Sequence, residues 1–139
     1  MGARISTGDE ALDKAAVNAH WLIRIAFASI FVYSGVDKFL GGGIGSFAVA
    51  MGLPHILALG VGFAELGGGI LVVIGGMANG WITRLGFAMT IPVLLGAIIM
   101  EHWGQWHFMA TATHPLGGMM FQVAFLLIAL YGLVRGNEF

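Results

Sequence analysis

The sequence of 139 residues contains no cysteine, and only 9% of its residues are charged, against about 25% in an ordinary soluble domain. The absence of cysteine excludes disulfides, iron–sulfur clusters, thiolate metal sites and thiol redox chemistry. Six basic and seven acidic residues leave a net charge of −1, so no basic patch for binding nucleic acid is expected. Hydrophobic residues make up 58% of the chain, which excludes intrinsic disorder and points to an integral membrane protein.

Four apolar stretches are long enough to cross the bilayer, whose hydrocarbon core of about 30 Å takes about 20 helical residues. We expect these spans over residues 21–40, 54–77, 81–102 and 116–134. A transmembrane barrel would need strands of alternating hydrophobicity, a pattern that the sequence does not show. The sequence therefore predicts an all-α fold, an integral membrane four-helix bundle over residues 21–139.

Residues 1–20 are more polar and predict a separate cytoplasmic or interfacial segment. Thr7 and Glu10 fit a capping box, with Thr7 as the N-cap residue. This pattern predicts a short amphipathic helix over about residues 8–20, which leads into the first span.

The connections between the spans differ in character. Three consecutive glycines, residues 41–43, end the first span, and a short interfacial or re-entrant turn is expected over residues 46–51. The third connection, residues 103–115, is longer and richer in polar and aromatic side chains. Functional residues often lie on loops of this kind.

Small residues are expected to pack the spans together, because helices in a membrane associate by close van der Waals contact. Gly60, Ala64 and Gly68 recur every four residues in the second span. They predict a helix face that lies directly against a neighbouring helix.

Basic residues near the ends of the spans indicate the orientation of the chain. With four spans, both termini and the second loop share one side of the membrane. Lys38 is the only basic residue on the other side, whereas five lie on the first: Arg4, Lys14, Arg24, Arg84 and Arg135. Both termini are therefore expected in the cytoplasm.

Glu65 lies near the middle of the second predicted span, where an ionised carboxylate is costly unless it is paired or protonated. Arg24 and Lys38 lie within about 40° of each other on one face of the first span, and Arg84 lies in the third span. We expect these four residues to form an intramembrane polar network that carries the chemistry. The alternative is a buried ion pair that only fixes the register of the helices.

A second group of residues with useful chemistry falls at the outward end of the bundle. Glu101, His102, Trp106 and His107 lie close together in the sequence. A quinone site needs an apolar slot, a histidine that hydrogen-bonds a carbonyl and an acid that moves protons, so we expect these four residues to bind quinone. The alternative is an interfacial aromatic belt with solvated histidines.

Metal and haem sites are not expected in this group. His102 and His107 are five residues apart, which does not place them on one helix face as a metal-binding pair. A haem would need facing histidines inside the helices, and these histidines lie at the margins of the spans. No metal, haem or flavin is therefore expected from this chain.

Three segments of the chain resemble the DoxX family of small four-helix membrane proteins. They are RIAFASIFVYSGVDKF at residues 24–39, GFAELGGGILVVIGG at residues 62–76 and TRLGFAMTIPVL at residues 83–94. Within these segments the matching positions follow in the family's order: Arg24, the pair Ser34-Gly35, Lys38, Glu65 and Arg84.

The resemblance continues after the third span, where HWGQWHF places His102 on the family histidine. The family often has a Gly-Gly-aromatic-Glu sequence at the start of the fourth span. Here Gly117 and Gly118 are followed by two methionines, a phenylalanine and Gln122. The acid is missing, and Gln122 is the nearest polar side chain, so chemistry that needs a fourth-span carboxylate is not expected.

The resemblance implies an inner-membrane protein of four helices. The name-giving members belong to an archaeal thiosulfate:quinone oxidoreductase, which passes electrons from a sulfur compound into the quinone pool, and other members are linked to redox-stress systems. The resemblance favours a quinone-linked membrane subunit that acts with a partner redox subunit or as a homo-oligomer. Quinone would be its only redox group. The alternatives are a non-catalytic assembly or anchoring subunit of a larger complex and a small-solute or proton carrier. The carrier is less consistent with a lone four-helix bundle.

Overall fold

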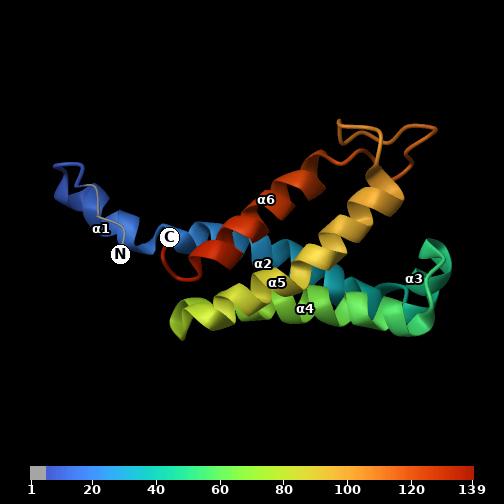
Figure 1. Cartoon of the computed structure of the whole chain (residues 1–139), viewed down its shortest axis with the longest axis horizontal. Coiled ribbons are helices and arrows are strands. Elements are labelled where there is room, and N and C mark those ends of the chain that lie inside the picture. The colour runs from blue at the N-terminus through green and yellow to red at the C-terminus, as the bar shows by residue number, and fades with distance from the viewer. Residues whose placement is uncertain (1–5) are drawn as a thin grey trace.

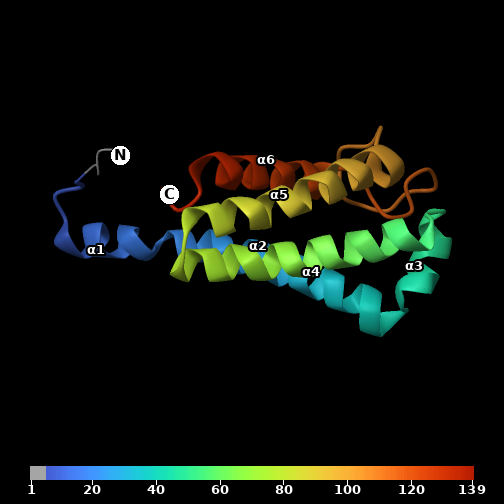
Figure 2. The ribbon, with the colours of Figure 1, turned by 60° about the horizontal axis from the view of Figure 1, so that its bottom comes forward.

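The computed structural model describes residues 6–139, and this part of the chain is helical without any strand. Figure 1 shows four principal helices: α2 (His20–Val36), α4 (His55–Met77), α5 (Gly80–Ala97) and α6 (Met120–Arg135). The pair α5 and α6 lies over the pair α2 and α4, and each helix packs against its neighbour in the sequence (Figure 2). The prediction of an all-α helical bundle is confirmed.

Three helical segments are long and apolar enough to cross a membrane: Glu10–Gly41, His55–Met77 and Gly80–His102. The fourth bundle helix, α6, is also apolar but has 16 residues. At 1.5 Å per residue it extends about 24 Å, somewhat less than the hydrocarbon thickness. The chain is therefore a membrane protein with three long apolar helices and a shorter fourth one.

The shorter fourth helix begins at Met120, although the sequence predicts a span that starts at residue 116. Gly118 and Met119 donate their backbone N–H groups to carbonyls of His107 and Gln105, at 2.9 and 2.8 Å. The residues before α6 are thus paired with the preceding loop and are not available for a helical turn.

The N-terminal helix α1 (Glu10–Asn18) extends beyond the bundle, at the end where the C-terminus lies (Figure 1). Its N-cap residue is Asp9, whose carboxylate accepts the backbone N–H groups of Ala11 and Leu12. The prediction that Thr7 caps this helix is wrong, because Thr7 donates its N–H and its hydroxyl to Asp13. Arg4, which contributed to the predicted orientation, lies outside the described residues.

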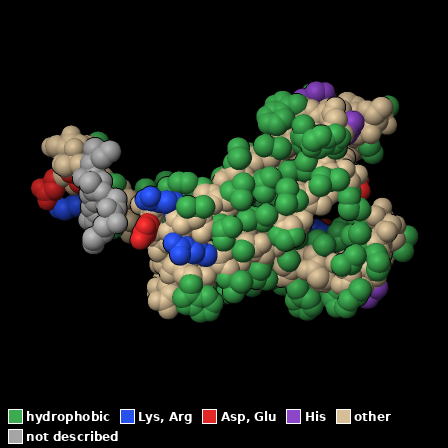
Figure 3. All heavy atoms as spheres, viewed as in Figure 1, with side chains coloured by type: hydrophobic (Ala, Val, Ile, Leu, Met, Phe, Trp, Pro, Cys, Tyr) green, Lys and Arg blue, Asp and Glu red, His purple; other side chains and the backbone are tan. Residues whose placement is uncertain are grey.

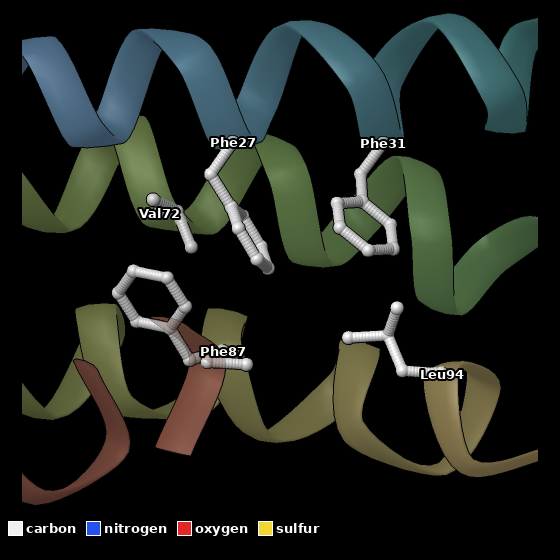
Figure 4. Close-up of a cluster of buried hydrophobic side chains, with 6 residues drawn as sticks. Phe27, Phe31, Val72, Phe87 and Leu94 are labelled. Carbon is white, nitrogen blue, oxygen red and sulfur yellow. The ribbon is translucent and has the colours of Figure 1, made fainter. Parts of the chain in front are cut away.

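The apolar core contains side chains from all four bundle helices. Phe27 and Phe31 of α2 point toward Phe87 and Leu94 of α5 (Figure 4). The rings of Phe27 and Phe87 meet edge to face, with 4.9 Å between their centres. Because lipid is as apolar as this core, such close packing provides the stabilisation that the hydrophobic effect provides in water.

Glycines allow the backbones of the central helices to approach each other. A Cβ atom on Gly86 of α5 would lie 2.7 Å from the backbone nitrogen of Val72 and 2.8 Å from the carbonyl oxygen of Gly68, both on α4. On the α2 side, a Cβ atom on Gly35 would lie 2.7 Å from the backbone nitrogen of Leu66. Gly60, which the sequence places on a packing face, is exposed and has no neighbouring atom within 4 Å of its Cβ position.

Two π-helical turns and one short helix complete the end of the bundle away from the C-terminus. The turn η1 (Asp37–Gly41) continues α2, and α3 (Ile44–Met51) follows it in place of the predicted interfacial turn. The turn η2 (Ile98–His102) continues α5, which contains Pro92. Proline and π-turns both bend helices, and α5 diverges from α4 toward this end (Figure 1).

The glycine contacts predict that Gly86→Ala destabilises the bundle. The added methyl group would meet the α4 backbone, which cannot move without separating the helices, and we expect a loss of about 1–3 kcal/mol. Gly60→Ala is the matched control on α4, where alanine favours the helix by up to about 1 kcal/mol. Thermal unfolding in detergent measures both, and equal stability of the two variants would contradict the close contact between α4 and α5.

Candidate functional site

A cavity of about 280 Å³ lies where α5 diverges from α4. Side chains of α3 and α4 line one side, and the end of α5 together with η2 lines the other. Most of the lining is apolar, but four ionisable side chains contribute to it: Lys38, Glu65, Glu101 and His102. Figure 3 shows this hollow between the part of the molecule that contains α3 and the end of α4 and the part that contains the end of α5. A basic side chain is visible at its base.

The rim of the cavity is apolar and exposed. Leu57, Met100 and Leu116 line the cavity and are each more than half exposed, at 56%, 53% and 56%. In a membrane protein, such side chains face hydrocarbon. An apolar, exposed rim of this kind suits a ligand that is dissolved in lipid.

Lys38, Ser34 and Glu65 form a closed triangle of hydrogen bonds at the base of the cavity. The Lys38 ammonium donates to Glu65 Oε2 at 2.7 Å and to Ser34 Oγ at 2.9 Å, and the Ser34 hydroxyl donates to the same Glu65 oxygen at 2.9 Å. The two charged side chains are well buried, with 16% and 8% of their surfaces exposed. Among the three basic residues that the sequence proposes for Glu65, Lys38 is therefore the partner.

The local structure explains how this triangle forms. Ser34 and Lys38 are one helical turn apart, so both project from the same face of the first span. Gly35 lets α2 approach the α4 backbone at Leu66, the residue next to Glu65. Only this close approach brings a side chain as short as serine within reach of the Glu65 carboxylate.

The opposite side of the cavity contains Glu101 and His102, which both belong to the π-helical turn η2. His102 is buried, with 7% of its surface exposed. Its Nδ1 atom lies 2.8 Å from the carbonyl oxygen of Gly117, and its Nε2 atom lies 3.1 Å from the amide nitrogen of Gln122. A neutral ring that carries its proton on Nδ1 satisfies both contacts. His102 thus connects the end of the third span to the start of the fourth.

Trp106 and His107, which the sequence assigns to the same quinone site, do not line the cavity. Both are exposed loop residues, and 54% of the Trp106 surface is accessible. The loop that contains them is ordered by Gln105, whose side chain bonds the carbonyl oxygens of His107 and Met109 and the hydroxyl of Thr111. The structure therefore brings Glu101 and His102 to the cavity and leaves the other two predicted residues outside it.

Arg24 lies in a second polar cluster, separate from Glu65. Its guanidinium is fully buried and donates to the carbonyl oxygen of Val72 at 2.7 Å, to Thr83 Oγ1 at 2.8 Å and to Asn137 Oδ1 at 2.8 Å. It also donates to His20 Nδ1 at 2.9 Å. Within residues 6–139 no carboxylate forms an ion pair with it. Neutral acceptors from three helices and the C-terminal segment surround this charge, which ties those elements together.

Arg84 belongs to neither cluster. Its side chain is exposed and donates to the carbonyl oxygen of Val134 at 3.2 Å, near the end of α6. The predicted four-residue network is thus divided into a Lys38–Glu65 pair at the cavity, an Arg24 cluster near the C-terminus and a surface arginine.

Five residues whose side chains bond the predicted site residues were not themselves predicted: His20, Ser34, Thr83, Gln122 and Asn137. The spacing of Ser34 and Lys38 by four residues is a signal that could have identified the serine. Gln122 lies near the position of the missing fourth-span acid. Its side-chain amide contacts His102 and takes the place of a carboxylate at this position. Thr83 and Asn137 gave no signal, because they meet Arg24 only through tertiary contacts over 59 and 113 residues.

Comparison with known proteins agrees with this architecture. A protein-family model described as DoxX matches residues 19–103, more than half of the chain. The match includes every charged residue of both clusters and ends at Trp103, the first residue of the loop, so it does not reach α6. No solved structure matches the chain.

The buried pair predicts a strong energetic coupling between Lys38 and Glu65. Lys38→Met leaves the Glu65 carboxylate buried without its cation, which should cost about 3–5 kcal/mol. The double variant Lys38→Met/Glu65→Gln removes both charges and should recover much of this loss.

Thermal unfolding of both single variants, the double variant and the parent chain completes the cycle. Arg84→Gln is the control, since this arginine is exposed and should change stability by no more than about 0.5 kcal/mol. A stability loss in the double variant equal to the sum of the losses in the two single variants would refute the coupling.

Proposed function

The chain belongs to the DoxX family of membrane proteins, and from this premise we propose that it binds a quinone within the membrane as one subunit of a quinone-linked redox system. The observation that supports the proposal best is the cavity between α4 and α5. It has apolar walls and an apolar exposed rim, and it contains ionisable groups on opposite sides. This combination suits a ligand with a long hydrocarbon tail and a polar ring.

The residues of the cavity fit the head group of such a ligand. Its volume of about 280 Å³ is close to the lower limit of about 300 Å³ for small-molecule sites. Phe47 and Val93 line it from opposite sides and would hold the flat ring. Lys38 and Glu65 would face one polar edge of the ring, and Glu101 the other.

A bound quinone supplies two-electron chemistry that is coupled to two protons. The chain's own residues would hold and move those protons. Glu65 retains one carboxylate oxygen, Oε1, that accepts no hydrogen bond from a described residue, because Ser34 and Lys38 both bond Oε2. Lys38 would stay paired with Oε2 of that carboxylate, and His102 would keep η2 in position rather than contact the ring.

The electrons would come from a partner subunit, because the chain has no cysteine and its sequence has no nucleotide-binding motif. We place the protein in the inner membrane with both termini in the cytoplasm, which is consistent with the Lys and Arg residues near the α1 and C-terminal end. In this orientation the cavity lies in the outer half of the membrane. An assembly or anchoring role is the second candidate, and the following experiment distinguishes the two.

Purified protein should retain quinone after mild solubilisation, and a variant with a filled cavity should not. Gly96 lines the cavity, and no atom lies within 4 Å of its Cβ position, so Gly96→Leu would fill the cavity without disturbing the polar groups. Gly60→Leu is the matched control, because Gly60 is equally unobstructed but is not part of the cavity.

Organic extraction and mass spectrometry quantify the quinone carried by each protein. We expect an about tenfold loss for Gly96→Leu, since a ligand excluded from its pocket loses most of its contacts, and no loss for Gly60→Leu. Glu65→Gln should also weaken retention while the protein stays folded. Absence of quinone from the parent protein, or equal retention in all variants, would refute the proposal and favour the assembly role.

A further inference from the structure

We infer that the cavity prefers the reduced, hydroxyl-bearing quinol to the oxidised quinone. This inference rests on the proposed function and specifies which form of the ligand the site selects. A quinol ring presents two O–H donors, whereas a quinone presents only carbonyl acceptors. The preference therefore depends on whether the cavity offers free acceptors or free donors.

Most of the donors of the cavity are already engaged. The Lys38 ammonium has three hydrogens, and two of them are used by Glu65 and Ser34. The Phe47 ring lies against the same ammonium, with its centre 4.8 Å from the nitrogen, and covers a further side of it. A quinone carbonyl could therefore reach only the one remaining N–H of this ammonium, beside the Phe47 ring.

His102, the other conventional donor, is also engaged. Its two ring nitrogens are occupied by the carbonyl group of Gly117 and the amide of Gln122. To donate to a quinone, the ring would have to break a buried hydrogen bond that fixes the start of the fourth helix. His102 therefore offers no free N–H to the cavity.

The acceptors of the cavity are free. The Glu101 carboxylate lines the cavity and forms no hydrogen bond or ion pair with any other residue in the part of the chain that the structure describes. Glu65 Oε1 is free in the same sense. The cavity thus contains two carboxyl groups but one ammonium, and within residues 6–139 no cation forms an ion pair with Glu101.

The oxidised and reduced rings would meet this arrangement differently. Two quinol hydroxyls on opposite edges of the ring would donate to Glu101 and to Glu65 Oε1, and hydrogen bonds to charged acceptors are the stronger class. Two quinone carbonyls would bring their lone pairs against the same carboxylates and would leave them desolvated. The geometry points to selection of the quinol by Glu101, with Glu65 as the second acceptor.

The test measures both redox forms on the intact protein in nanodiscs, with empty nanodiscs subtracted. The probes are decylubiquinone, its anaerobically reduced form, and the dimethyl ether of the reduced form, which keeps the ring but has no O–H donor. We expect the quinol to bind at least about tenfold more tightly than the quinone, as one charged hydrogen bond allows. A tenfold preference would raise the midpoint potential of the bound couple by about 30 mV relative to the couple in lipid. The dimethyl ether should bind no better than the quinone.

Glu101→Gln should reduce the preference to within about threefold, because the neutral amide is a weaker acceptor and adds a donor for carbonyls. Glu101→Asp retains the charge and should retain most of the preference. Since Glu101 has no partner within the described chain, neither substitution removes a stabilising contact, and unchanged thermal unfolding checks this.

The outcomes separate the two proposals. Equal binding of both forms, tighter binding of the quinone, or a preference that Glu101→Gln leaves intact would overturn the inference while the proposed function stands. Failure of both redox forms to bind would overturn the inference and the proposed function together.

Discussion

The close approach of α4 to both α2 and α5 is the constraint on which the rest of the structure depends. Backbone meets backbone at Gly35 and Leu66 on one side and at Gly68 and Gly86 on the other. In a membrane, where burial of apolar surface gives no advantage over lipid, this contact is what holds the bundle together. It also positions the polar groups, since Ser34 reaches Glu65 only because the helices touch one residue away. Where α5 diverges from α4, beyond the glycines, the cavity begins.

Two cations are buried in the part of the chain that the structure describes, Arg24 and Lys38, and their surroundings differ. Arg24 is enclosed by neutral acceptors and aromatic rings, and three of its four hydrogen bonds connect it to another element of the fold. Lys38 is paired with a carboxylate at the base of a cavity with an exposed apolar rim. A buried pair of this kind contributes little net stability, because desolvation offsets most of the attraction. Its position at the cavity is consistent with the proposed exchange of protons with a ligand.

The sequence predicts the helices well because the long apolar stretches have only one way to satisfy their backbone groups in a membrane. It also identifies Glu65 and Lys38, since a charge in an apolar stretch is conspicuous. It does not show that Arg24 and Lys38 serve separate clusters, because their spacing on one helix face says nothing about the partners that α4 and α5 supply. The start of α6 at Met120 and the exclusion of Trp106 from the cavity depend on hydrogen bonds within the loop. Such pairings between irregular segments have no periodic sequence signal.

The central claim is that the ligand occupies the cavity between α4 and α5 and not the aromatic loop. Photoaffinity labelling with an azido-substituted quinone tests this most directly, with the labelled residues mapped by mass spectrometry. The account predicts adducts on side chains that line the cavity, such as Met51, Val61 and Met100. Adducts confined to Trp103, Trp106 and His107 in the exposed loop would contradict it.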